Sequence, residues 1–149
     1  MRAVVQRTSG ASVVVGDRLT GSIEAGVVVL VGVAPDDGAA EAKWLADKLA
    51  NLRIFEDSEG KMNLSLLDVR GEALIVSQFT LYGDARKGRR PSFIRAAQGP
   101  RAEEVYESVV TELEGLGVRC ATGEFGAMMS VSLTNEGPVT ILLDSDKLF

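Results

Sequence analysis

Three polar side chains, Ser77, Gln78 and Thr80, stand where an apolar segment gives way to a positively charged one. The segment reads EALIVSQFTL, and the basic loop that follows carries Arg86, Lys87, Arg89 and Arg90. A purely structural strand has little reason to end in a serine, a glutamine and a threonine beside such a loop. The pattern favours a reaction site at the strand end and a phosphate contact in the loop, although a merely solvated basic loop is the alternative.

Histidine is absent from all 149 residues, and this limits the chemistry more than any other feature of the composition. The usual general base near neutral pH and the commonest metal ligand are both missing. Ser-His and Cys-His catalysis are therefore excluded within the chain, and a zinc site would need an unusual set of ligands. We expect no metal and no cofactor. The single Cys120 fits a buried or half-buried thiol in a reducing compartment.

A second motif, NEGPVT at residues 135–140, places Gly137 before Pro138 at the start of an apolar segment. Taken alone, each motif has an ordinary explanation. Thr80 suits a strand because it is β-branched, and most Gly-Pro pairs are trans turns, since only about 5% of X-Pro bonds in folded proteins are cis. The two motifs become informative because they occur together in one chain.

Length and charge set the broader limits. A chain of 149 residues fits a single domain, residues 1–149, that can bury a core without disulfides. The formal net charge of −5 argues against a protein that coats nucleic acid indiscriminately, although a local basic site remains possible. The start MRAVVQRTSG lacks the pattern of a signal peptide, and no apolar run approaches a membrane span. We therefore expect a soluble, cytoplasmic protein without a membrane partner.

The apolar spacing predicts the elements that hold these residues. Short strands with turns between them are expected at 3–9, 11–16, 17–24 and 27–33, antiparallel in sequence and with the last buried on both faces. A helix is expected over 38–52 behind an aspartate N-cap, and another from Pro100 to Gly117. Further strands are expected at 72–81, 118–123, 128–134 and 138–144, with a short strand and a turn near Asp57–Gly60. The predicted fold is α+β, with a mainly antiparallel sheet or partly closed β-barrel and two α-helices.

With these motifs in place, the chain resembles the D-aminoacyl-tRNA deacylases over nearly its whole length. The matching segments are VVQRTSGASVVV, VLVGVAPDD, RIFEDSEGKMN, SQFTL, RKGRRPSF and MSVSLTNEGPVT. The resemblance implies a homodimer, with aminoacyl-tRNA as its partner, that hydrolyses the ester joining a D-amino acid to the terminal adenosine. It also implies that the Gly137-Pro138 bond is cis and reaches across the dimer interface into the partner's pocket.

The resemblance makes Ser77, Gln78, Phe79 and Thr80 the catalytic set. An aminoacyl ester is already activated, so the backbone N–H groups of Phe79 and Thr80 could stabilise the oxyanion while a ribose hydroxyl of the RNA activates water. The Thr80 hydroxyl as nucleophile is the alternative, but it lacks an evident base.

The substrate-binding set is Gly137, Pro138, Arg7 and Met129. Arg7 either supports the Gly-Pro segment, by resemblance, or forms a surface ion pair. Met129 either lines an adenine pocket or packs in the core.

Steric exclusion by a rigid Gly-Pro segment would reject L-amino acids and accept glycine to some extent. Two other functions stay open at this point. One is a non-catalytic dimeric module that binds RNA or DNA ends, and the other is a general hydrolase of small amino-acid esters. Dependence of the rate on ionic strength separates RNA recognition from small-ester hydrolysis.

Overall fold

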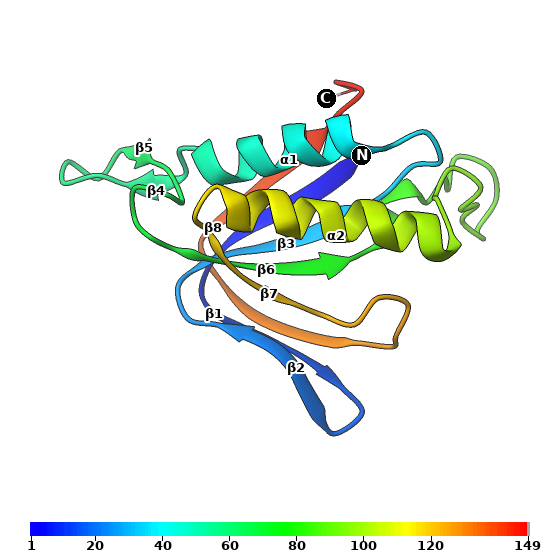
Figure 1. Ribbon diagram of the computed structural model, residues 1–149, viewed down its shortest axis with the longest axis horizontal. Coiled ribbons are helices and arrows are strands. Elements are labelled where there is room, and N and C mark those ends of the chain that lie inside the picture. Colours follow the sequence, from blue (N-terminus) through cyan, green and yellow to red (C-terminus); the bar gives the residue numbers. More distant parts are fainter. Residues whose placement is uncertain (149) are drawn as a thin grey trace.

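Two helices cover one face of a six-stranded mixed sheet in the computed structural model, which describes residues 1–148 (Figure 1). The sheet has the order β2-β1-β3-β6-β7, in which β2 pairs with the second half of β1 and β3 with the first half. The sixth strand, β8, lies outside this order and pairs with β1 along most of its length. A separate two-stranded hairpin consists of β4 and β5. The strands are β1 Arg2–Val15, β2 Arg18–Ile23, β3 Gly26–Gly32, β4 Phe55–Glu56, β5 Met62–Leu64, β6 Glu72–Ser77, β7 Arg119–Thr122 and β8 Ser130–Asp144. The helices are α1 Ala39–Asn51, the short 3₁₀ helix η1 Phe79–Tyr82, and α2 Gly99–Gly115.

The sheet curls until it is nearly closed into a barrel. Strands β2 and β7 approach so closely that a Cβ added to Gly21 would lie 2.4 Å from the carbonyl oxygen of Thr122, which leaves no room for a larger residue there. A small apolar cluster fills the inside of the curl: Ala11, Val13, Ile23, Val28, Leu74 and Val76. The larger core lies between the outer face and the two helices, which run side by side (Figure 1). The α+β prediction is confirmed.

Strand pairing is antiparallel where β1 meets β2, β3 and β8, in keeping with the mainly antiparallel sheet that the sequence predicts. The predicted sequential order is wrong at one point, because β3 pairs with β1 and not with β2. By contrast, β3 pairs with β6 and β6 pairs with β7 in parallel. Parallel neighbours need a crossover connection, and α1 and α2 lie in those two connections. The mixed sheet therefore follows directly from where the two helices fall in the chain.

Several predicted boundaries need correction. The two strands predicted within residues 3–16 are one long strand, β1, which spans residues 2–15. Residues 130–144 also form one strand, β8, because the Gly-Pro segment bulges without ending the pairing. The N-cap of α1 is Gly38 rather than an aspartate. Asp37 is instead buried, where it accepts hydrogen bonds from the Ala34 N–H and the Met1 amino group. The prediction that β3 is buried on both faces is confirmed.

The most consequential correction concerns the end of β6. The sequence predicts a strand through Leu81, but β6 ends at Ser77 and the chain then turns into η1. Gln78 still donates its N–H to the Val31 carbonyl, 2.7 Å away, at the end of β3. Since β3 ends at Gly32 and β7 pairs only as far as Ile75, no neighbouring strand remains to extend β6. The polar residues therefore occupy a turn at the sheet edge.

Candidate functional site

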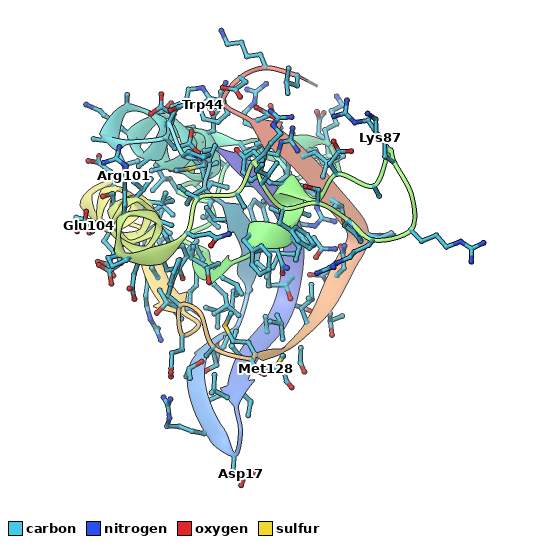
Figure 2. The ribbon with its side chains drawn as sticks, turned by 90° about the vertical axis from the view of Figure 1, so that its right-hand side faces the viewer. Asp17, Trp44, Lys87, Arg101, Glu104 and Met128 are labelled. Carbon is cyan, nitrogen blue, oxygen red and sulfur yellow. The ribbon has the colours of Figure 1, made fainter. Side chains whose placement is uncertain are left out.

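A cavity of about 640 Å³ lies at the end of β6, where the polar residues gather. Ser77, Gln78 and Phe79 line one side of it, and the start of α2 lines another. The segment that joins β7 to β8 closes the cavity, and Figure 2 shows Met128 on that segment. Val31 and Val33, at the end of β3, also line the cavity, so four parts of the chain meet at a single site.

The turn at Gln78 leaves two backbone donors at the edge of this cavity. The N–H groups of Phe79 and Thr80 lie in the first turn of η1, where a 3₁₀ helix has no earlier carbonyl to offer them. The Thr80 side chain is exposed, and its hydroxyl oxygen accepts a hydrogen bond from the Gln78 amide. Thr80 itself does not line the cavity, whereas its neighbour Phe79 does.

Helix α2 also begins at this cavity, which sequence reasoning missed. Gln98, Gly99 and Ala102 line the wall, and no side chain caps the helix N-terminus. Unpaired N–H groups and the helix dipole make such an end favourable for negative charge. Pro100 marked the start of the helix in the sequence, but no pattern indicated which part of the sheet that start would face.

Phe125 is a second lining residue that the sequence did not single out. Its ring packs against Tyr106 of α2, with ring centroids 5.7 Å apart. Met129, which was singled out, lines the same cavity and also packs against the apolar cluster inside the curl. Met129 therefore packs in the core as one interpretation had it and also faces a cavity, while its contact with adenine stays a prediction.

The peptide bond between Gly137 and Pro138 is cis, and this segment bulges out of β8. Thr8 pairs with Asn135 and Gln6 pairs with Thr140, so the β8 side has extra residues that leave the ladder. The Asn135 side chain spans the bulge, accepting from the Val139 N–H at 2.8 Å and donating to the Thr140 hydroxyl at 2.9 Å. Both Gly137 and Pro138 are exposed at the surface.

Arg7 holds the base of this bulge. Its Nε donates to the carbonyl of Glu136 at 3.0 Å, and its Nη1 donates to the carbonyl of Ile54 at 2.8 Å. The Glu56 carboxylate lies 3.9 Å from the guanidinium as a weaker ionic partner. Arg7 thus makes both kinds of contact that the sequence offered as alternatives, and the carbonyl contacts are the closer ones.

The two motifs do not share a cavity within one chain. Gly137 and Arg7 line a separate cavity of about 490 Å³, while Ser77 to Phe79 line the first. Along β3, Arg7 lies opposite Val27 whereas Ser77 lies opposite Val31. Four residues of strand separate them, which corresponds to about 13 Å along the strand direction.

The four cations of the basic loop are all exposed, and Lys87 projects from the loop in Figure 2. Arg86 differs from the others because its guanidinium pairs with Asp84 through Nε at 2.9 Å. The Arg86 guanidinium holds the pKa of the Asp84 carboxyl well below its usual range. Hence Lys87, Arg89 and Arg90 carry the positive charge that this carboxylate does not neutralise.

Residues 1–148 contain no group of three or more ligand side chains placed to hold a metal ion. Burial raises the pKa of the Cys120 thiol to about 12, so this side chain is a poor nucleophile. None of the helices in residues 1–148 is long and apolar enough to cross a membrane.

Comparisons with known proteins agree on one family. The family model for D-Tyr-tRNA(Tyr) deacylase matches residues 4–144. A D-aminoacyl-tRNA deacylase of Koribacter versatilis is 60% identical and one of Fervidobacterium nodosum is 57% identical, and each alignment covers 100% of both chains. A relative of the same name from Bacillus pumilus is 59% identical, covering 97% of this chain and 99% of its own.

Two solved structures share the fold. One is named c-Myc DNA unwinding element binding protein; it is 42% identical, has a TM-score of 0.91, and the match covers 97% of this chain and 99% of that chain. The other, a probable eukaryotic D-amino acid tRNA deacylase, has a TM-score of 0.82 at 20% identity, covering 95% and 97% of the two chains. At that identity the second match supports the fold alone.

Proposed function

The chain belongs to the D-aminoacyl-tRNA deacylase family and is an ester hydrolase of that kind, and from this premise we propose how its site works. The substrate is D-aminoacyl-tRNA, and the products are the free D-amino acid and tRNA. We place this activity in the cytoplasm. The observation that supports the proposed mechanism best is the turn at Gln78, which presents backbone donors, and no imidazole, at the edge of a cavity.

In this mechanism water attacks the ester carbonyl, and the neighbouring ribose hydroxyl of the RNA relays the proton: it accepts one proton from the water and passes its own proton to the ribose oxygen that leaves. The carbonyl oxygen becomes an oxyanion that accepts hydrogen bonds from the N–H groups of Phe79 and Thr80, each contributing on the order of 3 kcal/mol. The bond from the carbonyl carbon to the ribose oxygen then breaks, and that oxygen takes up a proton. Ser77 and Gln78 shape the wall that orients the ester.

The rival mechanism, with the Thr80 hydroxyl as nucleophile, fits the contacts less well. The hydroxyl oxygen accepts a hydrogen bond from the Gln78 amide, so its nearest polar neighbour is a donor and does not remove its proton. No histidine exists in the chain to serve as base. The backbone mechanism needs neither group.

The site is completed by a second copy of the chain. Within one protomer the Gly137-Pro138 bulge lies in a different cavity from the turn at Gln78, yet it is exposed and carried on an outer strand. In a homodimer each bulge enters the partner's cavity, where its carbonyl groups bind the substrate ammonium. Met129 then borders the terminal adenine on the opposite wall.

The Gly137-Pro138 bulge leaves no space for a side chain on the L face, so L-aminoacyl-tRNA is rejected by steric exclusion. Glycine has no side chain to exclude, and glycyl-tRNA is therefore accepted to some extent. Measuring deacylation of glycyl-tRNA beside L-alanyl-tRNA tests this account. Hydrolysis of the first without the second is expected, whereas complete inertness toward glycyl-tRNA would show that the pocket requires a D side chain.

A non-catalytic nucleic-acid module is the second candidate, and the solved structure named for binding a DNA element favours it. The basic loop would serve both functions, through contacts of Lys87, Arg89 and Arg90 with phosphates of the acceptor stem or of DNA. Comparing kcat/KM on D-aminoacyl-tRNA at low and high salt separates the possibilities. If the enzyme recognises tRNA, kcat/KM should fall as salt rises. Absence of hydrolysis at any salt would favour the binding module, and a kcat/KM that does not depend on salt would favour a small-ester hydrolase.

A further inference from the structure

The basic loop is closed at its base by a short backbone bridge. Asp84 and Ser92 exchange two hydrogen bonds, 2.8 and 2.9 Å long, and form an isolated antiparallel pair. The Asp84 carboxylate also accepts hydrogen bonds from the backbone and side chain of Arg86 inside the loop. The base of the loop is therefore anchored by hydrogen bonds on both sides.

Phe93 follows directly after this bridge and contacts η1, the segment that follows the turn at Gln78. Its ring lies edge-on to the ring of Phe79, with centroids 5.1 Å apart and an angle of 73° between the rings. A Cβ added to Gly83 would lie 3.0 Å from Phe93 and 3.0 Å from the Thr80 carbonyl oxygen. The segment that carries Phe93 is therefore closely packed against the end of η1. The segment after Phe93 is fixed in turn, because Ala97 donates its N–H to Val33 at 2.8 Å.

These contacts make a short path from the loop to the cavity. The bridge at Asp84 and Ser92 sets where Phe93 lies, and Phe93 packs on Phe79, which lines the cavity and carries one of the proposed oxyanion donors. Phe79 is 55% exposed, so few other contacts hold its ring. We propose that Phe93 is a positioning residue, through which RNA bound by the basic loop fixes Phe79 for catalysis.

This inference rests on the proposed function and adds a specificity step to it. When the acceptor stem engages the loop, the edge contact holds Phe79 and its N–H in place, so a complete tRNA is hydrolysed faster than the same ester on adenosine alone. A misplacement of about 1 Å in a catalytic group can reduce the rate up to 100-fold, which is enough for such a distinction. The enzyme thereby acts slowly on esters that lack the tRNA body.

The kinetic test compares D-aminoacyl-tRNA with D-aminoacyl-adenosine. Phe93→Ala is expected to lower kcat on D-aminoacyl-tRNA about tenfold with little change in KM for that substrate. The ratio of kcat on D-aminoacyl-tRNA to kcat on D-aminoacyl-adenosine should therefore fall. Phe93→Tyr keeps the ring and should retain the wild-type ratio. Gly83→Ala adds a Cβ 3.0 Å from the Phe93 ring, which must shift away, and it should reproduce the loss. Ile94→Ala, at the neighbouring residue, which is 85% exposed, serves as the matched control and should keep the ratio.

Two outcomes would overturn the inference. A higher KM for tRNA with an unchanged kcat would show that Phe93 only shapes the loop for binding. An equal loss on both substrates would show that Phe93 supports the cavity regardless of RNA. If Phe93→Ala is too unstable to measure, the same comparison with Gly83→Ala and Phe93→Tyr decides the question.

A second measurement separates this inference from the proposed function. Deacylated tRNA should slow backbone hydrogen exchange across residues 78–83 in the wild type and not in Phe93→Ala, at tRNA concentrations that saturate both. Slowed exchange in a protein that hydrolyses no D-aminoacyl-tRNA would refute the deacylase mechanism but keep the coupling. Hydrolysis without any slowing would refute the coupling and keep the mechanism.

Discussion

The two signature segments are held in place by different means. The turn at Gln78 ends a strand buried in the middle of the sheet, and it is fixed by backbone pairing of β6 with β3 and β7. The Gly137-Pro138 bulge leaves an outer strand, and it is fixed by side chains, chiefly those of Arg7 and Asn135. Backbone pairing tolerates many substitutions, whereas a single side-chain support does not. We therefore expect mutational sensitivity to concentrate at the bulge.

The largest effect is expected from Gly137→Ala. Gly137 has φ +132°, a region that side chains rarely adopt, and an added Cβ would lie 3.1 Å from the Val139 nitrogen and 3.2 Å from Arg7. The bulge must shift, so kcat/KM should fall about 100-fold. Gly115→Ala, at the exposed end of α2 with open space around it, is the matched control and should be neutral. Full activity of Gly137→Ala would mean that the bulge conformation is unimportant.

Arg7→Ala comes next. It leaves the carbonyls of Glu136 and Ile54 without their charged donor, which should lower the melting temperature. Only the bond to Glu136 holds the bulge, and such a bond contributes roughly 2 kcal/mol, so kcat/KM should fall about 30-fold. Arg7→Lys is the informative companion, because one ammonium cannot reach both carbonyls with the fork of a guanidinium. If Arg7→Lys keeps full activity, a positive charge at this position is sufficient, and the claim that the guanidinium must reach both carbonyls is wrong.

Asn135→Ala should have a smaller effect of the same kind. The side chain makes two hydrogen bonds within the bulge, accepting one from the Val139 N–H and donating one to the Thr140 hydroxyl, but Arg7 remains in place. Neutral hydrogen bonds contribute about 1 kcal/mol each, and the Thr140 hydroxyl keeps the Gln6 amide as a donor, so the net loss of one bond should lower kcat/KM about fivefold. A double variant with Arg7→Ala measures whether the two supports act together. Strict additivity would contradict the view that both hold one structural unit.

The smallest effect is expected at Thr80, in the segment that the backbone holds. Thr80→Ala removes the hydroxyl that accepts from Gln78 but keeps the N–H, so single-turnover hydrolysis should fall less than about threefold. Thr80→Ser keeps the hydroxyl and is the control. Complete loss in Thr80→Ala with intact tRNA binding would establish the threonine as nucleophile and reject the backbone mechanism.

The sequence predicted the helices well because they depend on local spacing. The buried face of α1, from Ala42 to Leu49, follows the apolar period, and Pro100 lies in the first turn of α2 as expected. The strands were harder, since pairing depends on partners elsewhere in the chain. The parallel pairing of β6 with β3 and β7, and the end of β6 at Ser77, are set by where neighbouring strands stop.

The site was partly visible in the sequence. The polar residues after Val76 marked one cavity wall, because polar groups at the end of an apolar strand are unusual. The other walls, from the start of α2 and from Phe125, carry ordinary residues whose importance comes only from tertiary position. The same applies to Phe93, whose contact with Phe79 spans a loop that no local pattern describes.

The central claim is that this site hydrolyses the ester of D-aminoacyl-tRNA and excludes the L form by shape. The most direct measurement is deacylation of one tRNA charged in parallel with the D and L forms of the same amino acid. The account predicts rapid release of the D-amino acid and negligible release of the L-amino acid under identical conditions. Equal rates on the two substrates would contradict it.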